Sequence, residues 1–181
     1  MNIFIVHAHP EPQSFTSAMK DAAVADFTAA GHQVVVSDLY AMNWNPVASA
    51  ADFGTRGNAD YMNYALEQRT NADAQTLAAD IVAELEKLEA ADLVIFSFPL
   101  YWFSVPAIMK GWFDRVLVSG RVYGGRRFYD QGGMKGKRAM LALTTGGRDH
   151  MLAEGGIHGD INSILMPVLQ GTLAYTGMTV L

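Results

Sequence analysis

The chain has 181 residues, of which 50% are hydrophobic and 17% charged, and its formal net charge is −5. This composition is that of one soluble globular domain with a packed core, and it excludes a disordered chain. The lack of basic blocks argues against nucleic-acid binding, and the lack of cysteine excludes disulfides and thiolate metal sites. No apolar run reaches the ~20 residues of a spanning helix, and the N-terminus lacks the features of a signal peptide. We therefore expect a cytoplasmic protein without membrane insertion.

The first 39 residues follow the order strand, helix, strand. "NIFIVHA" (2–8) is a short continuous apolar run, which is typical of a strand buried on both faces. Ser14 is placed to cap a helix that begins at Phe15, and Gly31 is placed to end it. "QVVVSDL" (33–39) predicts a second strand that lies parallel to the first through a right-handed crossover.

The remaining elements continue this alternation after an irregular excursion over residues 40–70, where we expect short helical turns. A helical stripe comes next, formed by Leu77, Ile81, Leu85 and Leu88. Strands are then predicted at 93–99, 138–144 and 178–181, with helices at 105–117 and 161–177 between them. Pro106 is tolerated at an early helical position, whereas Pro167 predicts a break or a kink.

Five strands that alternate with four helical segments predict an α/β fold, a doubly wound sandwich around a five-stranded parallel sheet. We expect the strand order 2-1-3-4-5 and a single domain over residues 1–181. A final helix is missing after the fifth strand, which suggests a truncated chain with part of one sheet face uncovered. Ligands of such sheets bind outside the carboxyl ends of the strands, so the loops after strands 1, 3 and 4 are expected to converge on one site.

The loop after strand 1 contains neither a P-loop nor a dinucleotide-binding fingerprint. It offers a helix N-terminus with Ser14 before it and Thr16 in its first turn, and free N–H groups there favour an anion such as a pyrophosphate. His9 can add a donor. The simpler interpretation is that Ser14 serves as a cap and nothing more.

The loop after strand 3 carries three consecutive aromatic residues, Tyr101, Trp102 and Phe103. Three neighbours cannot all face one core, so some of them line either a cleft or an interface. The alternative is a wall packed by the next helix.

The loop after strand 4 reads "TTGGRDHMLAEGGIHGD" (144–160). Gly146 and Gly147 allow the backbone to approach a ligand closely, and Thr144 and Thr145 add hydroxyl groups that suit the polar edge of a flat heterocycle. An ordinary turn and a structural His158 remain the alternatives. The five histidines show no spacing that indicates a metal site.

Four stretches together resemble the NAD(P)H:quinone oxidoreductase (DT-diaphorase) family of flavodoxin-like flavoproteins: "AHPEPQSFTSAMKDAA", "VVVSDLYAMNWNPV", "DIVAELEKLEAADLVIFSFPLYWFSVPAIMKGWFDRV" and "TTGG…GGIHGD". The resemblance implies non-covalent FAD, with FMN a weaker candidate, and NAD(P)H as co-substrate. It implies a two-electron, ping-pong hydride transfer to a quinone or a similar acceptor.

The resemblance also assigns residues to roles. Those implied to hold FAD are His9, Ser14, Phe15, Thr16, Pro99, Leu100, Tyr101, Trp102, Phe103, Thr144, Thr145, Gly146 and Gly147. Those implied to serve catalysis are His158, the backbone of Gly146 and Gly147, and Tyr123 and Tyr175, which a homodimer would contribute across its interface.

Two positions depart from the family pattern. Leu152 stands where the best-known members have a tyrosine that partners the histidine, and Gly125 stands where they have a second pocket tyrosine. A Tyr–His relay is therefore not expected, and the pocket is expected to be more open. The competing interpretations are an FAD-binding regulatory subunit, for example of a potassium-efflux transporter, and a one-electron carrier.

Overall fold

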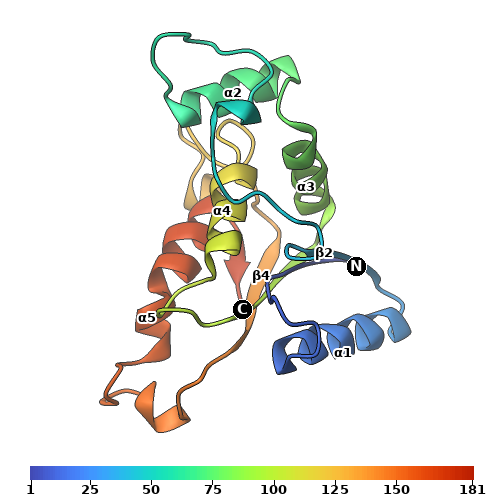
Figure 1. Cartoon of the computed structure of the whole chain (residues 1–181), viewed down its shortest axis with the longest axis vertical. Coiled ribbons are helices and arrows are strands. Elements are labelled where there is room, and N and C mark those ends of the chain that lie inside the picture. The colour runs from blue at the N-terminus through green and yellow to red at the C-terminus, as the bar shows by residue number, and fades with distance from the viewer.

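The computed structural model describes residues 1–181, and its centre is a five-stranded parallel sheet with the order β2-β1-β3-β4-β5 (Figure 1). The strands are β1 (Asn2–His7), β2 (Gln33–Asp38), β3 (Leu93–Pro99), β4 (Arg138–Thr144) and β5 (Thr179–Val180). The predicted fold class and strand order are confirmed. The predicted strands all form, although β5 has only two residues.

The central strands are buried on both faces, as their unbroken apolar sequences require. Every residue of β3 is buried, and so is all of β1 after Asn2. The two strands pair in register from Ile3 opposite Leu93 to His7 opposite Ser97. β2 forms one edge of the sheet and is half-exposed.

The helices form two unequal layers. α1 (Phe15–Ala29) alone covers one face, where Ala23, Val24 and Phe27 pack on a small cluster of isoleucines and leucine from β1 and β3. α3 (Ala79–Ala90), α4 (Ala107–Val116) and α5 (Ile161–Val168) lie on the other face, above the larger core (Figure 1). On the α1 face, the side chains of β4 are only half-buried. No helix has the length and apolar character needed to cross a bilayer.

The predicted helix ends are largely confirmed. Ser14 has an extended backbone and its side chain accepts a hydrogen bond from the N–H of Ser17, which makes it the N-cap of α1. Gly31 follows the C-cap with φ of +81°, a left-handed conformation that glycine adopts without strain. Pro106 is the N-cap of α4 and not a residue inside its first turn.

The prediction of short turns over residues 40–70 was incomplete, because an eleven-residue helix, α2 (Tyr64–Ala74), lies partly within this range. A 3₁₀ turn, η1 (Ala50–Asp52), precedes it. The buried side of α2 is polar and consists of Glu67, Gln68 and Asn71, so it carries no apolar stripe. Leu77 lies before α3, in a bridge with Phe53, and not on the helix itself.

The segment after α5 changes helical type without ending. Pro167 lies inside α5, and the chain continues as a π-helical turn, η4 (Leu169–Leu173), and a 3₁₀ turn, η5 (Ala174–Thr176). The missing N–H of a proline disturbs the regular ladder of an α-helix, so the irregularity that Pro167 predicted is present. Two further 3₁₀ turns are η2 (Tyr129–Gln131) and η3 (Asp149–Met151).

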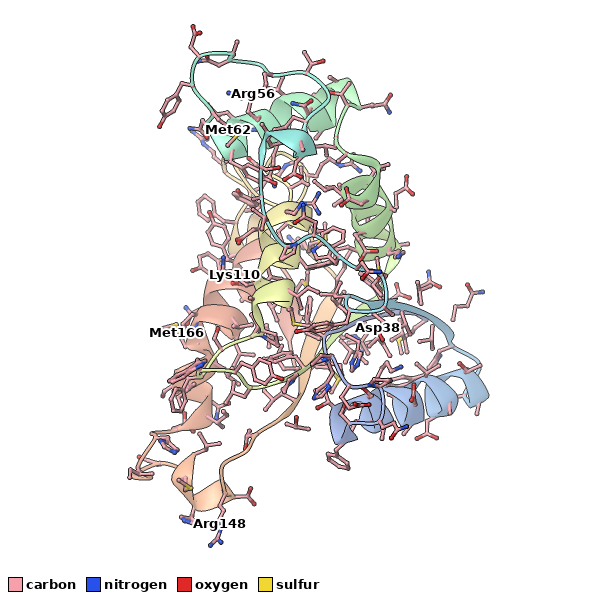
Figure 2. All side chains as sticks on the ribbon, in the orientation of Figure 1. Asp38, Arg56, Met62, Lys110, Arg148 and Met166 are labelled. Atoms are coloured by element: carbon pink, nitrogen blue, oxygen red, sulfur yellow. The ribbon has the colours of Figure 1, made fainter.

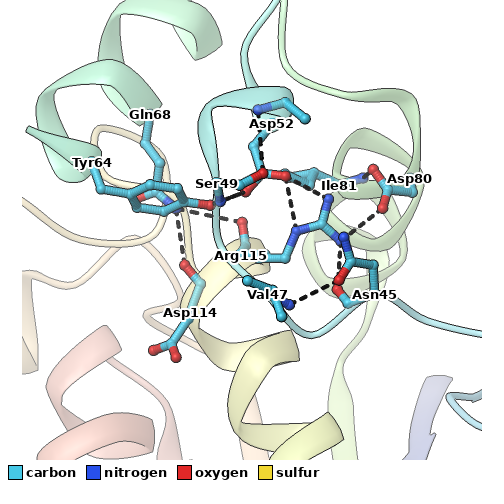
Figure 3. A network of polar contacts seen from close by, with 11 residues as sticks. Asn45, Val47, Ser49, Asp52, Tyr64, Gln68, Asp80, Ile81, Asp114 and Arg115 are labelled. Atoms are coloured by element: carbon cyan, nitrogen blue, oxygen red, sulfur yellow. Dashed lines mark hydrogen bonds and ion pairs between the residues drawn. The ribbon is translucent and has the colours of Figure 1, made fainter. Parts of the chain in front are cut away.

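A buried ion pair attaches the excursion after β2 to α4. The guanidinium of Arg115 donates to Asp52 at 2.8 Å and to Asp80 at 2.7 Å (Figure 3). Tyr64 donates to the other oxygen of Asp52, and the ring of Trp44 lies under the guanidinium, 4.6 Å from its central carbon. Burial alone would raise the pKa of Asp52, but hydrogen bonds from Arg115 and Tyr64 hold it below its usual range.

Candidate active site

A hydrogen bond between two threonines joins the first and third of the predicted loops. The hydroxyls of Thr16, in the first turn of α1, and Thr144, at the end of β4, are 2.8 Å apart. The N–H of Leu100, just after β3, donates to the carbonyl of Thr144. The three loops therefore meet at the carboxyl edge of the sheet, as the topology predicts. One of these two hydroxyls donates to the other.

The N-terminus of α1 presents two free donors at this edge. The N–H groups of Phe15 and Thr16 have no acceptor within the chain, while that of Ser17 is capped by Ser14. The side chain of Phe15 is 75% exposed and makes no part of the core. Free N–H groups combined with the helix dipole make this end of α1 suitable for an anion.

The ring of His9 is oriented by its own loop. Its Nδ1 accepts a hydrogen bond from the N–H of Glu11 at 3.0 Å. The same Nδ1 lies 3.1 Å from the carbonyl of Glu11, so both backbone groups of Glu11 orient the ring through this nitrogen. Nε2 has no partner in the chain and is available to a ligand beside the α1 N-terminus.

The aromatic loop after β3 is a tight turn in a strained conformation. Tyr101 and Ser104 exchange two backbone hydrogen bonds of 3.0 Å, and the residues between them, Trp102 and Phe103, have φ of +48° and +60°. Such a turn normally contains asparagine or glycine, since a left-handed conformation costs other residues about 1–2 kcal/mol each. The turn leaves the Trp102 side chain 95% exposed. Strain of this kind is typical of functional sites.

A pocket of about 220 Å³, the β3–β4 pocket, lies between the loops that follow β3 and β4. It is lined by Leu100, Trp102, Phe103, Thr145, Gly146, Gly147, Leu152 and His158. The N–H groups of Thr145, Gly146 and Gly147 have no partner in the chain, and the Thr145 hydroxyl donates to the Gly147 carbonyl. A Cβ added at Gly146 would meet nothing within 4 Å, so packing within the chain does not require glycine there.

His158 stands on one wall of this pocket. Its ring centroid is 5.3 Å from that of Phe103, and neither ring nitrogen has a hydrogen-bond partner in the chain. Leu152 lines the same pocket and therefore lies near His158, but it offers no polar group. The imidazole is available to a ligand. Arg148, in the same loop, points away from the body of the molecule (Figure 2).

Several residues expected at the flavin lie outside the pocket lining. Pro99 is buried at the end of β3. Tyr101 lies near Tyr40. The pKa of the Tyr40 phenol is raised by burial first and by Tyr101 second. His9, Ser14, Phe15 and Thr16 lie at the α1 end of the same sheet edge.

Tyr123 and Tyr175 belong to a second pocket, the tyrosine pocket, of about 500 Å³. Their rings are 6.1 Å apart, and the pocket is also lined by residues of α2, α4 and η4, including Lys110 and Asp114. Burial raises the pKa of Tyr123. This pocket shares no residue with the β3–β4 pocket, so the two tyrosines do not meet His158 within one chain.

A buried histidine at the same edge was missed as a functional candidate. His7, at the end of β1, is within hydrogen-bond distance of Ser97 and Ser17. The sequence contained a signal for it, because an imidazole at the end of a fully buried strand needs polar partners. His7 and His9 form no metal site, and no three His, Asp or Glu side chains in the chain cluster to hold an ion.

Comparison with known proteins agrees with this arrangement. A family model described as a flavodoxin-like fold matches residues 1–181. The chain is 47% identical over 180 residues to human ribosyldihydronicotinamide dehydrogenase (quinone), covering 99% of this chain and 78% of the human protein. The chain belongs to the flavodoxin-like quinone reductases. It is also 50% identical over 178 residues to NAD(P)H dehydrogenase (quinone) 1 of Rattus norvegicus, covering 98% of this chain and 65% of the rat protein.

Solved structures of quinone reductases extend the similarity to the fold. A Klebsiella pneumoniae protein, provisionally named a quinone reductase, is 45% identical with a TM-score of 0.96, covering 100% of this chain and 73% of that one. The NAD(P)H:quinone oxidoreductase of Methanothermobacter marburgensis is 28% identical with a TM-score of 0.77, covering 99% and 81%. The family is one of flavin-dependent enzymes that use NAD(P)H. The comparisons do not favour the regulatory subunit considered from the sequence.

Proposed function

We propose that this quinone reductase binds FAD and catalyses the two-electron reduction of quinones by NADH or NADPH. The observation that carries the proposal is the β3–β4 pocket, where free backbone donors, an unpaired His158 and a strained aromatic turn face one another. The Thr16–Thr144 bond connects this pocket to the anion-binding end of α1. A ring site and a phosphate site on one sheet edge suit an extended ligand such as a flavin nucleotide.

The residues present fit this cofactor. The free N–H groups of Phe15 and Thr16, with His9 Nε2, would hold the pyrophosphate. Leu100, Trp102 and Phe103 would border the flat ring, and Gly146, whose missing Cβ leaves open space, would admit it. FMN lacks the adenosine part but offers the same ring and one phosphate, so the choice of FAD over FMN is part of the proposal.

When bound, the flavin would supply the hydride-transfer chemistry between NAD(P)H and the quinone. The protein orients the reactants and stabilises charge. The N–H groups of Gly146 and Gly147, which have no acceptor in the chain, would donate to the negative charge that reduction places on the ring. His158 would donate or accept a proton at the acceptor, because its ring lines the pocket and neither ring nitrogen is engaged within the chain. Leu152 provides no relay partner, so His158 exchanges its proton directly with the acceptor or with water.

We also propose that the active enzyme is a homodimer. Tyr123 and Tyr175 line a pocket separate from His158 in the same chain, so a second copy is needed to bring them to the quinone. Sedimentation at micromolar concentration should give a dimer, and a monomer with full activity would exclude a shared site. A cytoplasmic location remains a prediction from the cysteine-free composition.

Steady-state turnover tests the proposed activity. The purified protein, loaded with FAD and then with FMN in parallel, is supplied with NADH or NADPH and a simple benzoquinone. We expect double-reciprocal plots at several quinone concentrations to be parallel, which is the pattern of a ping-pong reaction. Binding of FAD without quinone-dependent oxidation of either nicotinamide would favour a flavoprotein without this activity.

A further inference from the structure

A buried polar chain lies beneath the proposed phosphate site, and His7 is at its centre. His7 is 1% exposed at the end of β1. Its Nδ1 is 3.0 Å from the hydroxyl of Ser97 on β3, and its Nε2 is 3.2 Å from the hydroxyl of Ser17 on α1. The imidazole therefore bridges the central strand pair and the first turn of the helix whose N–H groups are free.

The surrounding hydrogen bonds accommodate this ring as a neutral imidazole. The Ser17 hydroxyl donates to the carbonyl of Glu11 at 3.0 Å and accepts from the Ser14 hydroxyl at 2.9 Å. Its remaining lone pair can accept from Nε2–H of His7, and Nδ1 can then accept from the hydroxyl of Ser97. The neutral tautomer of His7 with its proton on Nε2 thus gives both serine hydroxyls a hydrogen-bond partner.

The polar chain continues to the donors that face the ligand. Glu11, whose carbonyl is fixed by Ser17, donates its N–H to Nδ1 of His9 at 3.0 Å. Ser14, the partner of Ser17 on the other side, is the N-cap that shapes the start of α1. Both the imidazole of His9 and the free N–H groups of α1 are therefore held through Ser17, and Ser17 is held through His7.

We propose that His7 is a positioning residue that fixes the β1–α1 loop, residues 9–16, in the conformation that binds the flavin pyrophosphate. This inference rests on the proposed function for the identity of the ligand. The hydrogen bonds on which it depends are present in the ligand-free protein. A leucine of similar size at position 7 would fill the space, but it would leave the buried hydroxyl of Ser97 without a partner and would remove one of the three partners of the Ser17 hydroxyl.

The neutrality of His7 couples the loop to pH. The groups that act on the ring are Asp38 of β2, which favours its charge, and Lys20 and His9, which oppose it, with a smaller contribution from Asp21. Burial outweighs the acidic neighbours and lowers the pKa of His7 below 6.5. In an open loop the ring is hydrated and its pKa returns toward about 6.5. Acid therefore favours the open loop, and the closed loop is favoured fully above about pH 6.5.

The test uses amide hydrogen exchange and flavin titration on four proteins: wild type, H7L, S17A and the control S37A. Ser37 is a fully buried serine on β2 whose hydroxyl bonds to Glu84, so its loss weakens the fold away from the loop. In flavin-free H7L and S17A, we expect exchange in residues 9–17 to accelerate at least tenfold relative to wild type. The FAD dissociation constant should rise about tenfold in both variants and stay within twofold in S37A.

Two further measurements separate positioning from a general loss of stability. The double variant H7L/S17A should bind FAD no more weakly than either single variant, because both substitutions remove the same hydrogen bond between His7 and Ser17. In an H9Q background, FAD affinity should fall several-fold from pH 7.5 to pH 5.5, and H7Q should abolish that dependence. Additive losses, or a pH profile that H7Q leaves unchanged, would overturn the proposal.

The two proposals fail separately. If wild type binds no flavin, the proposed function is wrong, and the exchange comparison in flavin-free protein still decides the role of His7. If wild type binds FAD and reduces quinones while H7L shows unchanged exchange and unchanged FAD affinity, His7 does not position the loop.

Discussion

Thr16 and Thr144, which are 128 positions apart in the sequence, share a hydrogen bond of 2.8 Å between their hydroxyl groups. The bond fastens the first turn of α1 to the end of β4. It links the helix end with free N–H groups to the strand that leads into Thr145, Gly146 and Gly147. The phosphate and ring parts of the proposed flavin site therefore have a fixed spacing.

Replacing either threonine by valine should disturb this spacing. T16V keeps the shape of a side chain that is 2% exposed but leaves the Thr144 hydroxyl without its partner. We expect a loss of about 1–3 kcal/mol in the free energy of unfolding and weaker FAD binding. Urea unfolding and flavin titration measure the two effects. The double variant T16V/T144V should be less destabilised than the sum of the single variants, and strict additivity would show that the bond does not matter.

The strained turn at Trp102 predicts that a substitution which relieves the strain raises the stability of the protein and lowers its affinity for FAD. Asparagine adopts the left-handed conformation more easily than tryptophan, and Trp102 is 95% exposed, so W102N should gain about 1 kcal/mol in the flavin-free protein. This corresponds to a melting temperature about 2–4 °C higher. FAD affinity should fall several-fold because a stacking ring is lost. W102F keeps a ring and serves as the control. A W102N protein that is less stable, or that binds FAD as tightly as wild type, would contradict this role.

The ion pair between Arg115 and Asp52 predicts how stability depends on pH. Burial opposes the charge of Asp52, but hydrogen bonds from Arg115 and Tyr64 prevail and lower the pKa of this carboxyl. A lowered pKa means that the stabilisation is fully present above about pH 4 and is lost as the pH falls through the folded-state value. D52N should cost about 3–5 kcal/mol at pH 7, because it removes the buried carboxylate and leaves the guanidinium of Arg115 with a single, partly exposed carboxylate, that of Asp80.

The difference in urea unfolding between wild type and D52N should therefore shrink below pH 4. The exposed pair between Lys110 and Asp114 provides the control, and D114N should cost less than about 1 kcal/mol at neutral pH. A D52N protein with wild-type stability at pH 7 would show that the pair does not anchor the excursion after β2.

His158 should affect turnover without affecting cofactor retention. Its ring contacts Phe103 and has no hydrogen-bond partner in the chain, so H158A removes no structural bond. We expect the rate of quinone reduction to fall at least ~10-fold, a lower bound set beneath the ~10²–10⁴-fold that a positioned general acid contributes. The flavin absorbance should be retained. H150A, an exposed histidine in the same loop, is the control. An unchanged rate in H158A would remove His158 from the mechanism.

The sequence predicted the sheet well because its strands are signalled by local patterns. Runs such as residues 93–99 have no polar interruption apart from Ser97, and such runs occur in strands covered on both faces. α2 escaped prediction because its buried residues are Glu67, Gln68 and Asn71. Glu67 accepts hydrogen bonds from the N–H groups of Gly57 and Asn58 in the preceding loop, an arrangement that helical periodicity does not reveal.

The meeting of the three loops that form the candidate site was predictable, but the contacts among their residues were not. Parallel strands with known order bring the three loops to one edge, which is a consequence of topology. The pairing of Thr16 with Thr144 and of His7 with Ser97 and Ser17 depends on strand register and rotamers, which no local pattern carries. The left-handed turn at Trp102 ran against local propensity, because its aromatic residues do not favour positive φ.

Anaerobic titration of the purified protein, followed by its absorption spectrum, tests the central claim most directly. We expect a yellow protein, or one that becomes yellow with FAD, whose flavin band is bleached by one equivalent of NADH or NADPH. One equivalent of a quinone should then restore the band. A colourless protein that takes up neither FAD nor FMN would contradict the assignment of this sheet edge as a flavin site.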